Sequence, residues 1–379
     1  MSQGIRVPPR STSLCGEEFR FGRPKKSFAD FCRRFVTSFF LFGIRNTALV
    51  LRWVALYEKL QSGRQELIMA TSDSTALPDS AECWPAIRLA EWKETYATLH
   101  MWTQIVGKIR LELTPKVNHW WNVPLYVSSQ GLTTSLIPYR DRTFDMEFDF
   151  FHNQLVIRTS DPETTSVALG PRSVADFYHE VMAALRSLGL EVHIWKMPVE
   201  VADPIPFAQD HLHAAYDSEQ VQRLWRILLS VDAVFKVFRA RFVGKSSPVH
   251  FFWGSFDLAI TRFSGRRAPP RNDPDPVLRK IMQEAYSHEV ISAGWWPGGG
   301  EIQEAAFYCY AAPAPAGFAE GEVLPAEAFY HSGMGEYLLM YDAVRQARSP
   351  SAMLLDFLQS TYENGATAGK WDREALEAA

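Results

Sequence analysis

Cysteine is scarce in this chain of 379 residues, and the cysteines are never close in sequence. The four cysteines are Cys15, Cys32, Cys83 and Cys309, and none forms a Cys-x-x-Cys pair. Because the chain also lacks a His-Glu-x-x-His motif, it carries none of the common zinc signatures and no disulfide framework. Unpaired cysteines are typical of a reducing compartment, so we predict a cytoplasmic protein.

Long apolar runs are missing as well. The most apolar stretches are residues 35–43 and 47–57. Arg45 separates the two stretches, and Arg52 interrupts the second. A transmembrane helix needs about 20 apolar residues in succession, so we predict no stable membrane span. The net charge of -4 argues against a general nucleic-acid binder, and we predict no nucleic-acid partner.

What the chain does have is the composition of a globular protein, with 47% hydrophobic and 22% charged residues. It is also rich in tryptophan, with 12 residues, and their large side chains will dominate burial wherever they lie.

The first 68 residues differ from the rest in charge. They contain 12 basic and 5 acidic residues, whereas the remainder contains 27 basic and 38 acidic residues. A basic, acid-poor segment could be an organelle-targeting peptide or a helix at a membrane surface. Alternatively, translation could begin at Met69. We expect residues 1–68 to be dispensable for folding.

The stretch from residue 117 to residue 169 alternates between apolar and polar residues, which is the period of β-strands. A two-residue hairpin turn would place Phe148 opposite Ile157 and Glu147 opposite Arg158. One face of this hairpin would be apolar and the other mostly charged. Such alternation is typical of a half-buried antiparallel sheet.

Two later segments have helical spacing and begin at capping residues, Ser173 and Asp217. Residues 190–195 alternate like a further strand, and residues 337–347 have a helical pattern. Because strands precede helices instead of alternating with them, we predict an α+β fold of antiparallel β-sheets packed by helices.

Prolines between residues 198 and 206 divide this fold into two halves. We expect a β-rich N-terminal half at residues 84–197, which ends in a helix and a strand. An α+β C-terminal half would follow at residues 207–371.

Four segments carry a family resemblance: residues 96–102, 118–121, 247–257 and 286–300. Through them the chain, from about residue 84 to residue 371, resembles an uncharacterised bacterial family known as domain of unknown function 5996. The resemblance implies no activity. It does imply that residues 1–68 lie outside the shared region.

Two histidines and two carboxylates are the candidate catalytic residues: His250, Asp257, His288 and Glu289. Two imidazoles and a carboxylate could form a facial metal triad, or one histidine could be a general base oriented by an acid. A bulge at Gly254 would bring His250 and Asp257 together. His288 and Glu289 are adjacent and would point apart on a regular element, so at most one of them is expected to join the site.

Glycines are concentrated in one short stretch, with four between residues 294 and 300. Glycine at this density costs conformational entropy, and we interpret it as backbone that approaches a ligand closely. We therefore predict that His250 and His288 line one pocket whose wall includes Trp295 or Trp296.

Aromatic and basic side chains complete the predicted ligand site. Aromatic rings can stack on a flat ligand, and guanidinium groups suit anions. The predicted ligand-binding residues are Trp253, Trp295, Trp296, Arg262, Arg266, His119 and Trp120.

These residues suggest two functions. The first is a soluble enzyme that acts on a small polar or anionic molecule through a histidine-containing site. The second is a non-catalytic protein that binds a small ligand in a pocket of tryptophan and arginine side chains. No motif assigns a cofactor or a metal.

Overall fold

The structure is a computed structural model, and it describes residues 77–378. Our predictions for residues 1–68 lie outside the described residues. Leu77–Ala379 form one compact unit. A single large apolar core extends through it, with members from Trp84 to Trp371.

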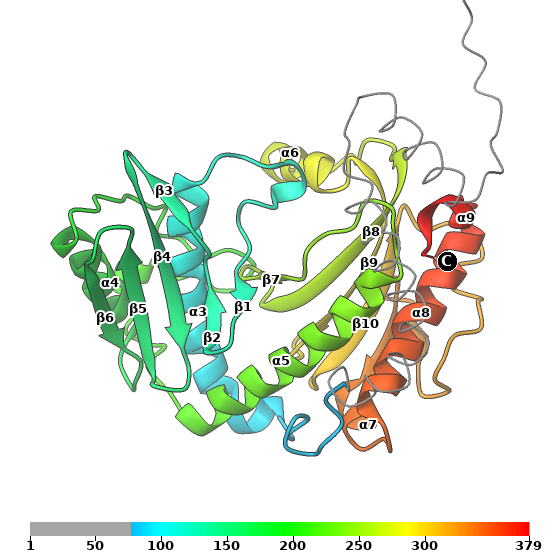
Figure 1. The fold of residues 1–379 in the computed structure, drawn as a ribbon, viewed down its shortest axis with the longest axis horizontal. Coiled ribbons are helices and arrows are strands. Elements are labelled where there is room, and N and C mark those ends of the chain that lie inside the picture. The colour runs from blue at the N-terminus through cyan, green and yellow to red at the C-terminus, as the bar shows by residue number, and fades with distance from the viewer. Residues whose placement is uncertain (1–76, 379) are drawn as a thin grey trace, which may run out of the picture. The chain divides into compact units, whose positions relative to one another are not determined.

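Helices and strands are labelled in Figure 1. The helices are α3 (Leu89–Leu113), η1 (Asn118–Trp120), α4 (Val174–Ser187), η2 (Phe207–Gln209), α5 (Ser218–Ala240), α6 (Pro276–Ala285), α7 (Tyr341–Arg345), α8 (Pro350–Ala368) and α9 (Arg373–Leu376). The strands are β1 (Tyr126–Val127), β2 (Gly131–Thr133), β3 (Ile137–Tyr139), β4 (Arg142–Asp149), β5 (Gln154–Thr159), β6 (Thr164–Ala168), β7 (His250–Phe252), β8 (Asp257–Arg267), β9 (His288–Trp296), β10 (Ala306–Ala312), β11 (Phe329–His331) and β12 (Glu336–Met340).

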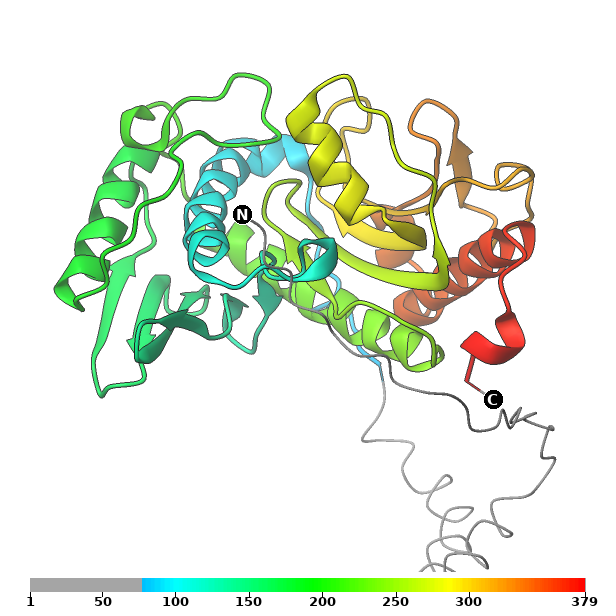
Figure 2. The ribbon, with the colours of Figure 1, turned by 90° about the horizontal axis from the view of Figure 1, so that it is seen from above.

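The strands form two antiparallel sheets, so the fold is α+β, as predicted. The first sheet has the order β1-β2-β4-β5-β6, with β3 paired to β4, and the second has the order β11-β12-β10-β9-β8-β7. Figures 1 and 2 show α4 beside the first sheet and α8 beside the second, with α3 and α5 between them. Each predicted half thus contains one sheet, while the division into halves itself stays a prediction.

The predicted hairpin has the right faces but the wrong register. Phe148 pairs with Leu155, and Asp145 pairs with Arg158, a shift of two residues. The turn is longer than predicted because β4 ends at Asp149, whose carboxylate accepts a hydrogen bond from the backbone N–H of His152. A shift of two keeps every side chain on its face. Phe148 is therefore fully buried, as predicted.

Two other segments differ from their predicted structure. Residues 190–195 are extended and bury Leu190, Val192 and Ile194, but they pair with no strand in the described part of the chain. Their alternation reflects burial alone. Residues 336–340 form strand β12 instead of a helix because they pair with β10, and only the next five residues are helical. Tertiary pairing overrides the local helical pattern there.

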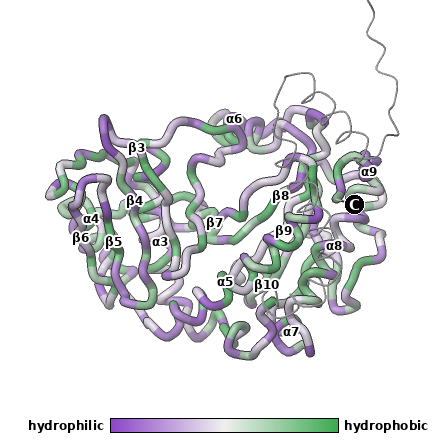
Figure 3. The backbone as a smooth tube through the Cα atoms, in the orientation of Figure 1, coloured by the Kyte–Doolittle hydropathy of each residue, from purple (hydrophilic) through white to green (hydrophobic). Residues whose placement is uncertain are grey.

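The glycine-rich stretch is mostly strand. Residues 288–296 form β9, and the turn toward β10 uses Gly298 and Gly300, whose φ angles are 95° and 59°. Figure 3 shows hydrophobic residues along parts of β8 and β9. The density of the four glycines predicts backbone that approaches a ligand. Those at 298–300 belong to a chain reversal, where positive φ favours glycine.

The second sheet has two unlike faces. One face packs on α5 and α8 and contains Leu258, Ile260 and Trp295. Side chains alternate along a strand, so their neighbours point the other way. We call that second side the polar face. It contains His250, Phe252, Asp257, Ala259, Thr261, Phe263, His288, Val290, Ser292, Gly294, Trp296, Tyr308, Tyr310 and Glu336.

Candidate functional site

His250 and Asp257 lie on adjacent strands of the polar face. His250 pairs with Ala259, and Asp257 pairs with Phe252, so the two are diagonal neighbours across β7 and β8. Diagonal positions in an antiparallel pair are about 7–8 Å apart. The connection between β7 and β8 places them together, because it reverses the chain between the two residues. Both side chains are buried, with exposed fractions of 1% and 7%.

The carboxylate of Asp257 is held by two hydroxyl groups. Tyr308 donates to its Oδ2 and Ser255 donates to its Oδ1. Tyr308 reaches Asp257 from β10 by passing over β9, where Gly294 has no side chain to block it. A Cβ atom at position 294 would lie 2.3 Å from Tyr308 Cζ. One of the four glycines therefore makes room for a side chain of this site.

Burial shapes the protonation of this end of the polar face. It raises the pKa of Asp257, although the hydrogen bonds from Ser255 and Tyr308 oppose the rise. Burial, followed by the charge of Asp257, raises the pKa of Glu336 to about 7. A carboxyl group with the pKa of Glu336 can exchange protons near neutral pH.

The imidazole of His250 lies among aromatic rings and one buried cation. Its ring centroid is 5.6 Å from that of Tyr126 and 5.8 Å from that of Trp121. The guanidinium of Arg110, from α3, lies 5.1 Å from the Tyr126 ring. Burial, then the charges of Arg110 and Arg239, lowers the pKa of His250 to about 3, so its ring is neutral at physiological pH.

Two buried nitrogens at this place have no hydrogen-bond partner: Nε2 of His250 and Nη1 of Arg110. No ion pair of Arg110 occurs among the described residues, and its Nε donates to the Asn122 carbonyl at 2.8 Å. Buried polar groups are nearly always hydrogen-bonded.

His288 lies at the far end of the polar face. Its ring is 5.7 Å from the ring of His119, and Nε2 of His119 lies 2.7 Å from Nζ of Lys245. The ring of Trp121 lies between His250 and His119, with ring centroids 5.8 Å from His250 and 5.5 Å from His119. His250 and His288 thus share a face but do not touch.

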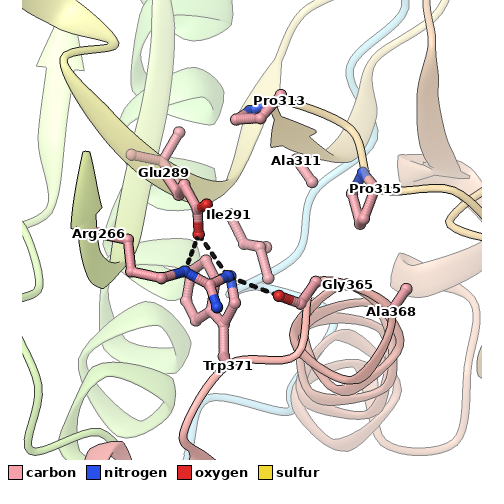
Figure 4. A pocket seen from close by; sticks show the side chains of 11 residues that line it. Arg266, Glu289, Ile291, Ala311, Pro313, Pro315, Gly365, Ala368 and Trp371 are labelled. Atoms are coloured by element: carbon pink, nitrogen blue, oxygen red, sulfur yellow. Dashed lines mark hydrogen bonds and ion pairs between the residues drawn. The ribbon is translucent and has the colours of Figure 1, made fainter. Parts of the chain in front are cut away.

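Glu289 and Arg266 form an ion pair on the opposite side of β9 from His288. Figure 4 shows this ion pair. The guanidinium of Arg266 also donates to the carbonyls of Gly369 and Lys370, so its groups are engaged. The hollow beside them has a volume of about 180 Å³, below that of most ligand sites. As expected, the side chains of His288 and Glu289 point to opposite faces of strand β9.

Arg262 and Trp295 lie in the core of the second sheet, on the face that packs on α5 and α8. Arg262 is 1% exposed, and its guanidinium stacks on Phe238 and Tyr362 at 3.4 and 4.2 Å. Trp295 is fully buried and contacts Tyr341. Neither faces His250, so the structure places neither in the predicted pocket.

The remaining predicted aromatic residues are scattered. Trp253 packs on Gly107 and donates to the carbonyl of Val123. Trp120 donates to the carbonyl of Ile281 in α6. Only Trp296 lies near the carboxylate of Asp257. Its ring is 6.2 Å from the ring of Tyr308, which donates to that carboxylate.

No group of three or more histidine, cysteine or acidic residues within residues 77–378 is arranged to hold a metal ion, so the predicted metal triad does not form. A second hollow, of about 510 Å³, lies along α4 and residues 191–196 and includes none of the predicted site residues. In the described part of the chain, no helix is long and apolar enough to cross a membrane.

Several residues of this site escape sequence reasoning: Arg110, Tyr126, Ser255, Tyr308 and Glu336. Four of them carry no motif. Ser255 alone offered a signal, since it lies two residues before Asp257 in a tight chain reversal.

The fold and the polar face define an α+β protein with buried acid and histidine groups on one sheet. The chain belongs to a family of unknown function, DUF5996, whose sequence pattern matches residues 84–378. This confirms the resemblance found in the sequence. No curated protein and no solved structure matches the chain.

Proposed function

We propose that the protein is an enzyme that transfers a proton to or from a small polar or anionic molecule bound between His250 and Asp257. One observation carries the proposal: Nε2 of His250 is buried without a partner, diagonally across from Asp257. A substrate oxygen or nitrogen would complete this hydrogen bond. Asp257 would act as the general base or acid, because burial raises its pKa above that of an exposed carboxyl group.

The other residues would have supporting roles. The hydroxyl groups of Tyr308 and Ser255 hold the carboxylate of Asp257 in place. The unpaired Nη1 of Arg110 would bind a negative group of the substrate. Tyr308 and Glu336 are only partly buried, so the substrate would enter from their side. Burial of the rest would exclude water and strengthen these interactions.

A second function is favoured by the rings of Trp121, Tyr126 and Phe252, which surround His250. Aromatic rings around a polar group are also the lining of a binding pocket. In this case the protein would retain a small ligand without converting it, and the proton-transfer role of Asp257 would be absent.

The experiment that tests the proposal incubates purified protein with a small-molecule extract of bacterial cells and follows the extract by mass spectrometry. An enzyme makes at least one compound disappear over time, and Asp257→Asn should stop this while the protein stays folded. Asp203→Asn, on the surface, is the matched control. A compound enriched with the protein but not converted would favour the binding function, and no change of either kind would contradict both.

A further inference from the structure

We propose that Lys245 and His288, with His119 positioning Lys245, form a binding site for a phosphate group at the far end of the polar face. This site does not depend on the proposed enzyme function. It rests on a cluster of basic side chains that lacks any acidic partner in the described part of the chain, and on the contacts that hold this cluster in place.

Two hydrogen bonds orient the cluster. Nζ of Lys245 lies 2.7 Å from Nε2 of His119, and Nδ1 of His119 lies 3.1 Å from the carbonyl of Ala285. A carbonyl only accepts, so Nδ1 carries the hydrogen and Nε2 accepts from the ammonium. His119 is therefore neutral, Lys245 is charged, and two further N–H groups of Lys245 stay available for a ligand.

Two aromatic rings lie beside this ammonium, although Lys245 itself is exposed. It lies 4.7 Å from the ring centroid of Phe263 and 5.1 Å from that of Trp121. Cation–π contacts of this kind hold a charge without neutralising it. The cation therefore keeps its attraction for an anion.

One further cation, Arg267, lies near the cluster, and the nearby acids are occupied. His288 lies 5.7 Å from His119, ring to ring, and pairs across the sheet with Arg267. The adjacent acids Glu284 and Glu289 form ion pairs with Lys116 and Arg266. The pKa values of His119, Lys245 and His288 are all lowered, by burial first. Positive neighbours lower the values of the two histidines further, which a bound anion would reverse.

The backbone at the cluster is strained. His119 and Trp120 have φ angles of 59° and 60°, in the left-handed region that residues other than glycine rarely adopt. Two such residues in succession cost free energy, and strain of this kind concentrates at functional sites. Here it turns the His119 ring toward Lys245 and α6.

A phosphate suits this cluster better than a monovalent anion does. It carries more charge and several oxygens, so it can accept hydrogen bonds from Lys245 and His288 together. The source could be inorganic phosphate or the phosphate of a small phosphomonoester, since the two present the same group.

The test is calorimetric titration with inorganic phosphate at constant ionic strength in sodium chloride. Wild-type protein should bind phosphate saturably, and Lys245→Met should weaken binding at least about tenfold, because it removes a charged donor but keeps the stem that packs on Phe263. Lys245→Arg should retain part of the affinity. Lys93→Met, on the exposed side of α3, is the control and should bind like wild type.

Two results would overturn the site: no saturable binding by wild-type protein at millimolar phosphate, or equal binding by Lys245→Met. Glycerol phosphate in place of inorganic phosphate distinguishes the sources, because tighter binding of the ester identifies a phosphomonoester. Asp257→Asn should leave phosphate affinity unchanged. The phosphate site and the proposed enzyme function can therefore fail separately.

Discussion

Gly294 lies directly beneath the side chain of Tyr308, and a Cβ atom at position 294 would be 2.3 Å from the Tyr308 hydroxyl oxygen. This relationship connects three strands. It lets a tyrosine of β10 pass over β9 and donate a hydrogen bond to Asp257 of β8. The acid–base end of the polar face thus depends on a position that has no side chain.

Gly294→Ala should therefore destabilise the protein by about 1–3 kcal/mol, as overpacking in a close-packed interior does. Thermal or urea denaturation measures this directly. The cost should largely vanish in a protein that already carries Tyr308→Ala. Gly170→Ala is the control, because a Cβ there meets nothing within 4 Å. An equal cost of Gly294→Ala with and without Tyr308 would contradict the relationship.

Glu336→Gln should change how stability depends on pH. Burial and the charge of Asp257 raise the pKa of Glu336 to about 7, above its value in the unfolded chain. The folded state therefore holds this proton more tightly, so stability is full at low pH and falls as pH rises from about 4.5 through 7.

The variant cannot ionise, so it should match wild type near pH 4 and exceed its stability near pH 8, by about 2 kcal/mol. Urea denaturation at several pH values checks this, with exposed Glu322→Gln as the control. A constant difference between Glu336→Gln and wild type across this range would show that the carboxyl pKa is not raised.

Two substitutions on β4 test which face of the first sheet is buried. Phe148 is fully buried, so Phe148→Asp should cost at least about 3 kcal/mol. Glu147 accepts hydrogen bonds from Ser128 and Arg158, at 2.7 and 2.8 Å, and its side chain is only 12% exposed. Glu147→Ala should therefore cost about 1–2 kcal/mol, more than an exposed ion pair would. Urea denaturation ranks the two variants, and the opposite ranking would invert the faces.

The fold class could be predicted because alternation and capping are local. Ser173 caps α4 by accepting from the N–H of Asp176, as its position suggested. The hairpin register could not be predicted in this way. It depends on a hydrogen bond to the carboxylate of Asp149, the residue at which β4 ends. A residue-by-residue pattern does not contain the hydrogen bond that sets the turn length.

The site was predictable only in part, for a similar reason. His250 and Asp257 come together through one short chain reversal, which sequence spacing can suggest. Arg262 was misplaced because arginine is rarely buried, and its stacking on Phe238 and Tyr362 involves distant segments. The proximity of His119 to His288 likewise depends on how the chain folds over 168 intervening positions, which no local pattern shows.

Histidine signals followed by NMR test the central claim most directly, namely that a ligand lies between His250 and Asp257. Protein labelled in its histidines would be titrated with a compound that it converts or retains. The account predicts a shifted His250 signal and a rise of its pKa from about 3, because a bound anion offsets the charge of Arg110, while exposed His211 stays unchanged. A bound compound that leaves the His250 signal and pKa unchanged would contradict the account.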